Sequence, residues 1–487
     1  MLCAAWTVAI PLGGAPDEPA HIVKAAGTVR GELIGQPVRR AQSATRDFRV
    51  PAVFKSVYQL PACYQFHSGT PAGCAPHLRS SSRIVTVSSY VGRYLPLYYA
   101  VVGLPTLVMH SESVIYFMRL LSALISALLL SLALSIAVIW CRTTMMMEAI
   151  ALAMTPLAIF LAGVVNPNGF EIAAAICAWT SGLALVRNGT AQPPRAVLAA
   201  FITSGCLLEL TRGLSVLWMA LILLTLVCLE PRSCFLLLRR WNVRIGVGVL
   251  VVVGAVAVGY VVTARTLRVL PSSALPPHHE SFVVLTEHVL GQFGFFLRQF
   301  LGVFGWLDTP SPLLSTILWA SLLGFILVLG LTVSKRSDGV VLALLLLGSF
   351  VLTIALIEWN SRTLGITWQA RDGFPLYAGV PLVAGIVIPR RALEGFGTSP
   401  TRRLALVVAL GIGVTQLADL LWTLRRFTVG LGRTVNPFHH VSHGWSPPLG
   451  IPFAVVLATA AVILYTGWLF KLMAGGSDRK VPALTGS

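Results

Sequence analysis

Apolar segments of about 20 residues recur along this chain of 487 residues, and they constrain its fold more than any other feature. A helix rises 1.5 Å per residue, so a segment of that length crosses a hydrocarbon core about 30 Å thick. Only 11% of the residues are charged, whereas soluble domains carry roughly 25%. The pattern therefore predicts an all-α integral membrane protein with about twelve transmembrane helices and a large first extracytoplasmic loop.

The expected spans can be placed to within a few residues. The segment 1–13 is too short to cross a membrane, and we interpret it as a partial first helix whose beginning is missing. The other expected spans are 113–140, 145–165, 170–186, 196–210, 213–229, 243–263, 311–333, 339–358, 374–389, 404–424 and 451–471.

Arginine and lysine gather in every second loop, and this alternation predicts the orientation of the chain. The basic loops include residues 232–244, 335–336 and 390–403. The positive-inside rule assigns these loops and both termini to the cytoplasm and leaves residues 14–112 outside, because long loops cross regardless of charge. The net charge of +18 thus reflects lipid-facing loops, and we expect no nucleic-acid partner.

This topology divides the chain into six expected regions. They are a partial first transmembrane helix (1–13), an extracytoplasmic loop with surface helices (14–112), a transmembrane bundle (113–263), an extracytoplasmic amphipathic segment (264–310), a second bundle (311–471) and a cytoplasmic tail (472–487). Residues 95–110 are apolar, but two prolines interrupt them, so we expect an interfacial or re-entrant element there.

The sharpest local signal is the sequence PDEPAH at residues 16–21, directly after the first apolar segment. Asp17 and Glu18 are suited to capping a helix over about 18–32, because acidic residues favour helix N-termini. The alternative is chemical: a carboxylate at the membrane surface, with His21 one helical turn further on, can act as a general base or bind a metal. Residue types alone leave both interpretations open.

A second signal is FGWLDTP at residues 304–310. An aromatic-belt Trp306, a capping Asp308 and a proline in the first helical turn explain it structurally, and the preceding residues 281–303 suit a surface helix. A third signal is a group of charges at the expected outer helix ends: Glu171, Glu209, Arg212, Glu358, Arg371 and Asp372. Ionisable groups at such positions usually face a bundle interior or a wet cavity, and an arginine there can bind a lipid phosphate.

Cysteine and histidine give two further expectations. Cys63 and Cys74 are the only cysteines in the expected external loops, where oxidation is permitted, so we expect them to form a disulfide. The group His439, His440 and His443 has the residue type of a metal site but no partner motif.

Four of these stretches together resemble a family of bacterial polytopic membrane proteins of unknown function that is grouped with the GT-C class of glycosyltransferases. They are residues 16–21 (PDEPAH), 96–100 (PLYYA), 166–171 (NPNGFE) and 305–309 (GWLDT), and they appear in the family's order. The family's Gln-Gly-Arg-Tyr stretch before a proline is altered here, since only Gln369, Arg371 and Pro375 are retained.

The resemblance implies a GT-C architecture and an acidic residue near the membrane that serves as catalytic base or metal ligand. Asp17 matches that position, with Glu18 and His21 beside it as further catalytic candidates. The expected function is transfer of a sugar from a polyprenyl-phosphate donor to a cell-envelope acceptor on the outer face of the bacterial inner membrane. Arg212, Arg371, Asp308 and Glu171 are the expected residues for substrate or lipid phosphate. We expect Asp308, Arg212 and Arg371 to lie near Asp17 in one shared site.

The sequence leaves several points open. The expected partners are membrane lipid, the polyprenyl-phosphate sugar and an envelope glycan. The cofactor is unknown, and a divalent metal is one candidate. The alternatives are a transporter or lipid-carrier flippase, which should show internal repeats and binding groups near mid-membrane, and a non-catalytic envelope-assembly protein.

Overall fold

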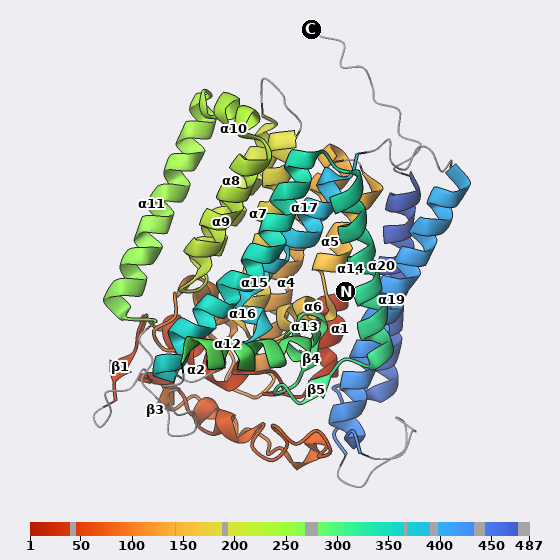
Figure 1. Cartoon of the computed structure of the whole chain (residues 1–487). Helices are drawn as coiled ribbons and strands as arrows, with labels where there is room; N and C mark the ends of the chain where they lie inside the picture. Colours follow the sequence, from red (N-terminus) through yellow and green to blue (C-terminus); the bar gives the residue numbers. More distant parts are fainter. Residues whose placement is uncertain are drawn as a thin grey trace.

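The computed structural model describes residues 1–38, 45–141, 143–187, 193–267, 281–364, 368–389, 398–432 and 444–475. Most of these residues form helices that run side by side in one bundle (Figure 1). Seven helices are long and apolar enough to cross a membrane among the described residues. They are α4 (Val114–Ile136, extended by a π-helical turn, Ala137–Cys141), α7 (Pro167–Arg187), α11 (Trp241–Ala264), α14 (Leu313–Val333), α15 (Arg336–Leu364), α19 (Thr398–Val429) and α20 (Gly450–Gly475).

Two bent pairs of helices raise the number of candidate spans to nine within the described chain. Helices α5 (Thr144–Ala153) and α6 (Pro156–Ala162) meet at 59°, and α9 (Ser215–Leu229) and α10 (Pro231–Leu238) at 110°. In both pairs a proline begins the second helix. Proline suits this position because an N–H group in the first helical turn has no intrahelical partner to lose. The bends therefore have a local chemical cause.

Shorter helices occupy the remaining expected spans: α1 (Leu2–Ala9), α8 (Arg195–Glu209), and α16 (Ala370–Tyr377) with α17 (Gly379–Val387). Each of the twelve expected segments thus coincides with a helix or a consecutive pair of helices. The expected architecture is confirmed: this is a multi-pass helical membrane protein, and a count of twelve is consistent with it.

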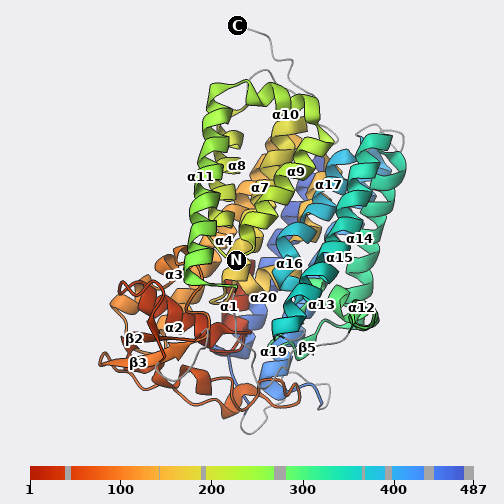
Figure 2. The same ribbon diagram turned by 60° about the vertical axis from the view of Figure 1, so that its left-hand side comes forward.

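The described residues between 14 and 112 lie together at one end of the bundle (Figure 2). They begin with α2 (Glu18–Thr28) and contain an antiparallel sheet of β1 (Gln36–Pro37), β2 (Arg46–Pro51) and β3 (Ile84–Ser89). Short helices η1 (Ala52–Gln59) and η2 (Ala72–Cys74) connect β2 to β3. The sequence predicts surface helices here but gives no sign of the sheet.

Helix α2 packs directly on this sheet. Phe48 of β2 and Val87 of β3 are paired across the strands and both are buried. A Cβ atom at Gly27 would lie only 2.2 Å from the Phe48 ring, so a glycine is needed where the helix approaches the sheet. The sheet therefore holds α2 and the residue before it, Asp17, against the bundle.

The segment 95–110 does not span the bundle. It forms α3 (Leu97–Val102) and η3 (Leu104–Leu107), both of which contact α2 and α4. The later segment expected to lie on the surface contains α12 (Phe282–Gly291), α13 (Phe293–Leu301) and a two-residue pairing of β4 (Val303–Phe304) with β5 (Thr309–Pro310).

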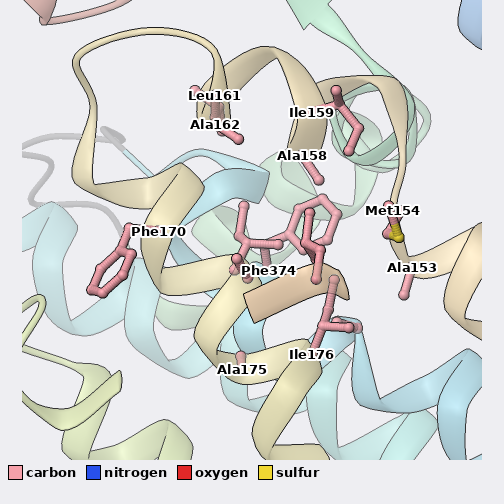
Figure 3. Close-up of a cluster of buried hydrophobic side chains, with 14 of the residues drawn as sticks. Ala153, Met154, Ala158, Ile159, Leu161, Ala162, Phe170, Ala175, Ile176 and Phe374 are labelled. Carbon is pink, nitrogen blue, oxygen red and sulfur yellow. The ribbon is translucent and has the colours of Figure 1, made fainter. Parts of the chain in front are cut away.

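The core lies around α7, whose apolar stretch is entirely buried in the bundle. Figure 3 shows Phe170 and Ile176 of this helix together with Ala158 of α6 and Phe374 of α16. A Cβ atom at Gly169 would lie 2.4 Å from the Leu161 backbone, so the turn between α6 and α7 closes only because this residue is glycine. That turn carries Asn166 and Asn168 to the end of the bundle beside α2.

Candidate functional site

Asp17 occupies the position before α2 but does not cap it. Its backbone is in the left-handed region (φ 62°), which is uncommon for a residue other than glycine. The carboxylate makes no capping hydrogen bond to α2. Instead it accepts hydrogen bonds from the Tyr90 hydroxyl (2.7 Å) and from Arg371 Nη2 (2.5 Å). The structural interpretation of Asp17 as a helix cap is therefore wrong.

The surroundings of Asp17 keep it ionised. Burial opposes the charge, but the Arg371 guanidinium and the Tyr90 hydroxyl outweigh burial, so the pKa of Asp17 lies below its ordinary value. Burial and the neighbouring carboxylate raise the pKa of Tyr90. At neutral pH the tyrosine is therefore a hydroxyl donor and Asp17 a carboxylate.

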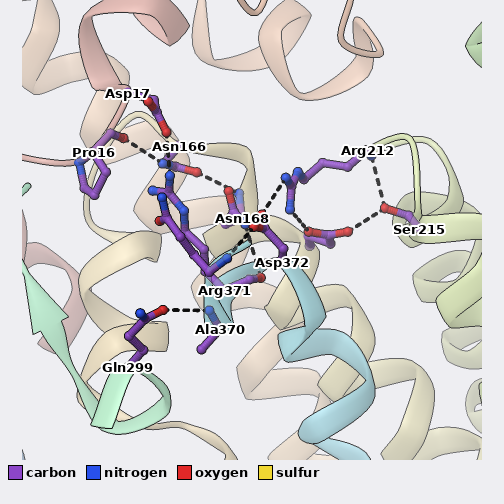
Figure 4. Close-up of polar contacts among 12 residues, drawn as sticks. Pro16, Asp17, Asn166, Asn168, Arg212, Ser215, Gln299, Ala370, Arg371 and Asp372 are labelled. Atoms are coloured by element: carbon purple, nitrogen blue, oxygen red, sulfur yellow. Dashed lines mark hydrogen bonds and ion pairs between the residues drawn. The ribbon is translucent and has the colours of Figure 1, made fainter. Parts of the chain in front are cut away.

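The turn between α6 and α7 connects Asp17 with α16 (Figure 4). Asn166 Nδ2 donates to the carbonyl of Pro16 (3.0 Å), and Asn166 Oδ1 accepts from the backbone N–H of Asn168. Asn168 Nδ2 then donates to the carbonyl of Arg371 (3.2 Å). These two asparagines therefore position both members of the Asp17–Arg371 pair, a role that the NPNG sequence alone did not reveal.

Arg212 lies next in the same network. It is bound on two sides, to Glu171 (3.2 Å) and to Asp372 (2.9 Å). Ser215 donates a further hydrogen bond to Glu171 (2.7 Å). Burial disfavours the charged guanidinium, but the two carboxylates outweigh this effect and raise the pKa of Arg212. Its charge is thus already balanced by protein groups, so it is less suited than expected to bind a phosphate.

Arg371 differs from Arg212 because part of its guanidinium has no partner. The residue is 8% exposed, its Nη2 pairs with Asp17, and Nη1 is buried without a hydrogen-bond partner among the described residues. The neighbouring Gln369 Oε1 is likewise buried and unpaired in the part of the chain that is described. Unpaired buried polar groups of this kind cost free energy, and a bound anion would satisfy the guanidinium.

Ala370, the residue before this arginine, lines an apolar pocket of about 240 Å³. Trp368 and Ala370, which precede Arg371, line it together with Phe296 and Phe300 of α13. Gln299 fixes the start of α16 there by accepting a hydrogen bond from the Ala370 N–H (2.8 Å). Ala370, which lines the pocket, and Arg371, which carries the unpaired nitrogen, are thus consecutive residues.

His21 lies one turn into α2 and is 2% exposed. Its Nδ1 shares a hydrogen bond with the Tyr99 hydroxyl (2.8 Å), and the two rings stack. Burial lowers the pKa of His21 to about 3. The imidazole is therefore neutral at physiological pH, which suits positioning of Tyr99 more than donation of a proton.

Glu18 has a structural role, which corrects its assignment as a catalytic residue. It is fully buried and forms a two-point ion pair with Arg119 of α4 (2.6 and 2.7 Å). Its oxygens also accept hydrogen bonds from the backbone N–H groups of Gly13 and Val165. No part of this carboxylate remains for a substrate.

Asp308 belongs to a different network from Asp17, contrary to the shared site that we expected. Its carboxylate pairs with Arg426 of α19 (2.5 Å). Arg426 also donates to the carbonyls of Tyr64, His67 and Thr70. Among the described residues, Asp308 thus pairs with the arginine of α19 that binds the first loop.

The disulfide lies in the part of the loop that Arg426 contacts. Cys63 and Cys74 are bonded, with their Cα atoms 6.2 Å apart. Arg426 donates hydrogen bonds to backbone carbonyls between the two cysteines. A covalent bond and hydrogen bonds therefore fix the same loop.

The described residues around Asp17 do not form a metal site. The partners of Asp17 are a cation and a hydroxyl donor, whereas hard divalent metals need several oxygen ligands. Within the described residues no group of three or more His, Cys, Asp and Glu side chains has metal-binding geometry. The cluster His439, His440 and His443 lies outside the described residues.

The solved structures that are similar to this chain include two of ArnT from Cupriavidus metallidurans. The crystal structure of ArnT bound to undecaprenyl phosphate has a TM-score of 0.44 and 12% identity, covering 98% of this chain and 76% of ArnT. The apo structure has a TM-score of 0.40 and 12% identity, covering 97% and 73%. No curated protein matches the sequence.

The family comparison covers most of the chain, including the Asp17, Asn166 and Arg371 segments. The matching model is described as a predicted membrane protein family, and it spans residues 1–380. This extent agrees with the order of motifs in the sequence and with the helical bundle. The chain therefore belongs to the DUF2142 family of predicted membrane proteins.

Proposed function

We propose that this protein transfers a sugar from a polyprenyl-phosphate donor to a hydroxyl group of an envelope glycan, on the extracytoplasmic face of the membrane. The single observation that carries the proposal is the state of Arg371. Its buried guanidinium pairs with the Asp17 carboxylate and has one unpaired nitrogen, and the preceding residue, Ala370, lines an apolar pocket. A phosphate attached to an apolar chain fits these two features together.

The pocket suits the chain of such a donor. It is lined almost entirely by aromatic and aliphatic side chains from α12, α13, α15 and α16. Apolar chains gain free energy from burial in this kind of surface. The phosphate at the end of the chain would then meet Arg371, which can bind two phosphate oxygens at once.

In the proposed reaction an acceptor hydroxyl oxygen forms a bond to the anomeric carbon as the bond from that carbon to the phosphate oxygen breaks. The Asp17 carboxylate takes the hydroxyl proton, and the electron pair of the broken bond leaves on the polyprenyl phosphate. Arg371 stabilises the negative charge that grows on the leaving phosphate. No metal step is needed for this balance.

The Asp17–Arg371 ion pair suits this sequence of events. Before the donor binds, the arginine holds Asp17 in its ionised form, as its lowered pKa indicates. When a phosphate draws the guanidinium away, the carboxylate loses its counter-charge and its affinity for a proton rises. Donor binding would thus make Asp17 a stronger base at the moment when a base is required.

The test is transfer of labelled sugar from synthetic polyprenyl-phosphate sugars to envelope glycan by the purified protein in membranes. Asp17→Asn keeps the shape of the side chain and should lower transfer by about 10²-fold or more. Arg371→Gln should weaken donor binding and transfer, whereas Arg371→Lys should recover part of both. Asp47→Asn, in β2, is the matched control and should retain wild-type transfer.

Full transfer by a folded Asp17→Asn variant would refute the role of Asp17. Absence of transfer by the wild-type protein with all donors, together with donor movement across the bilayer, would instead favour the flippase alternative.

A further inference from the structure

The opposite end of the bundle carries an apolar crevice that the proposed reaction does not use. Its volume is about 230 Å³. Leucine, valine, isoleucine and phenylalanine side chains from the ends of α7, α8, α9 and α11 line it, and Cys234, Leu237 and Leu238 of α10 complete it. The crevice therefore lies against α10, at the end of the bundle far from residues 14–112 (Figure 2).

Helix α10 has the features of a segment that lies in the membrane interface. It turns away from α9 by 110°. Phe235, Leu236 and the adjacent Trp241 are exposed although they are large and apolar. Side chains of this type, next to a sharp bend at the end of a span, usually lie at the level of lipid head groups.

Five exposed arginines belong to or flank the helices that line the crevice: Arg195, Arg232, Arg239, Arg240 and Arg244. None of them pairs with a carboxylate among the described residues. The nearby Glu230 is already bound to Arg187 (2.9 Å), and Arg187 also holds Asp338 (2.7 Å). Arg239 and Arg244 lie over the rings of Phe235 and Trp241, which holds their charges beside the apolar surface.

An apolar crevice with a rim of unbalanced positive charge matches one chemical class of ligand. We propose that this end of the protein is a binding site for an anionic diacyl phospholipid, with an acyl chain in the crevice and the phosphate on the α10 arginines. A zwitterionic lipid supplies the acyl chain, but its head group carries no net charge, so the arginines attract it less. A phosphate ion lacks the chain.

The test is native mass spectrometry of the full-length protein in neutral detergent, with phosphatidylglycerol or phosphatidylcholine that carry identical acyl chains. The wild-type protein should retain phosphatidylglycerol at least about fivefold better. Replacing Arg232, Arg239 and Arg240 together with Gln should remove this preference, so that phosphatidylglycerol retention falls by about fivefold or more. Lys55→Gln, Arg79→Gln and Arg83→Gln together, at the opposite end, form the matched control and should leave it unchanged.

Two further measurements distinguish a lipid site from a site for free phosphate or for a second copy of the chain. Val247→Trp fills the crevice and should weaken phosphatidylglycerol retention without removing any charge, and soluble glycerol phosphate should not compete. Equal retention of the two lipids, an equal loss in the control variant, or displacement by glycerol phosphate would overturn the proposal. So would a protein dimer that the Val247→Trp change dissociates, since the crevice would then bind a second copy.

Discussion

Asp17 and Glu18 are adjacent residues of the same chemical type with opposite surroundings. The left-handed backbone of Asp17 turns its carboxylate toward Arg371, while Glu18 begins α2 and extends into the bundle toward Arg119. Asp17 retains partial exposure, whereas Glu18 is fully buried. One carboxylate is therefore available for chemistry and the other supports the fold.

This difference gives a prediction about stability. Glu18→Gln leaves Arg119 buried without a counter-charge, and breaking such a pair typically costs about 3–5 kcal/mol. We expect the variant to be poorly extracted and to melt well below the wild-type protein, while Asp17→Asn, whose pair with Arg371 is partly exposed, should lower the melting temperature less. Fluorescence-detected gel filtration over a temperature series measures both, with Glu32→Gln as the control.

A Glu18→Gln variant that melts like the wild-type protein but has lost sugar transfer would return Glu18 to the catalytic residues.

At the scale of elements, the loop between Cys63 and Cys74 is held by two kinds of contact. The disulfide closes it covalently, and Arg426 of α19 binds carbonyls of Tyr64, His67 and Thr70 within it. Asp308 balances the charge of Arg426. One arginine thus connects the first loop, the β4–β5 turn and a transmembrane helix.

We expect the disulfide to stabilise this loop by about 3 kcal/mol, as the chain-entropy model gives for a closure of this size. Cys63→Ser with Cys74→Ser should therefore lower the melting temperature and increase proteolysis between residues 60 and 75. Reductant should reproduce the effect in the wild-type protein and have no effect in the double variant. Unchanged proteolysis would show that Arg426 alone holds the loop.

At the scale of the whole molecule, the two ends of the bundle differ in their chemistry. One end carries residues 14–112 and the Asp17–Arg371 network, and the other carries the arginines around α10. The positive-inside rule predicts that the α10 end faces the cytoplasm. With this predicted orientation, the proposed transfer site would lie on the extracytoplasmic side.

Single cysteines introduced at Arg83 and Arg240, both exposed, test the orientation. A membrane-impermeant maleimide should label the position 83 variant in intact cells and the position 240 variant only after permeabilisation. A background that retains Cys63 and Cys74 but no other cysteine provides the control. The reverse labelling pattern would invert the topology.

The helices and their order could be predicted from the sequence alone. A lipid-spanning helix satisfies its backbone hydrogen bonds within its own segment, so its signal is local and can be read from about 20 consecutive residues. The disulfide was also predictable, because Cys63 and Cys74 are the only two cysteines in the expected external loops. Asp17 and Arg371 were candidates on similar grounds, as charges at the ends of apolar runs.

The pairing of the charged side chains could be seen only in the folded structure. Arg371 lies 354 residues from Asp17, and Arg119 lies 101 residues from Glu18. Such pairs depend on how helices pack, and a linear pattern does not encode that packing for an isolated charge. The same reason explains why the β2–β3 pairing was missed and why Asp308 was placed beside Asp17 instead of Arg426. Residue types identified the charged groups, and the packing of the bundle determined which of them pair with one another.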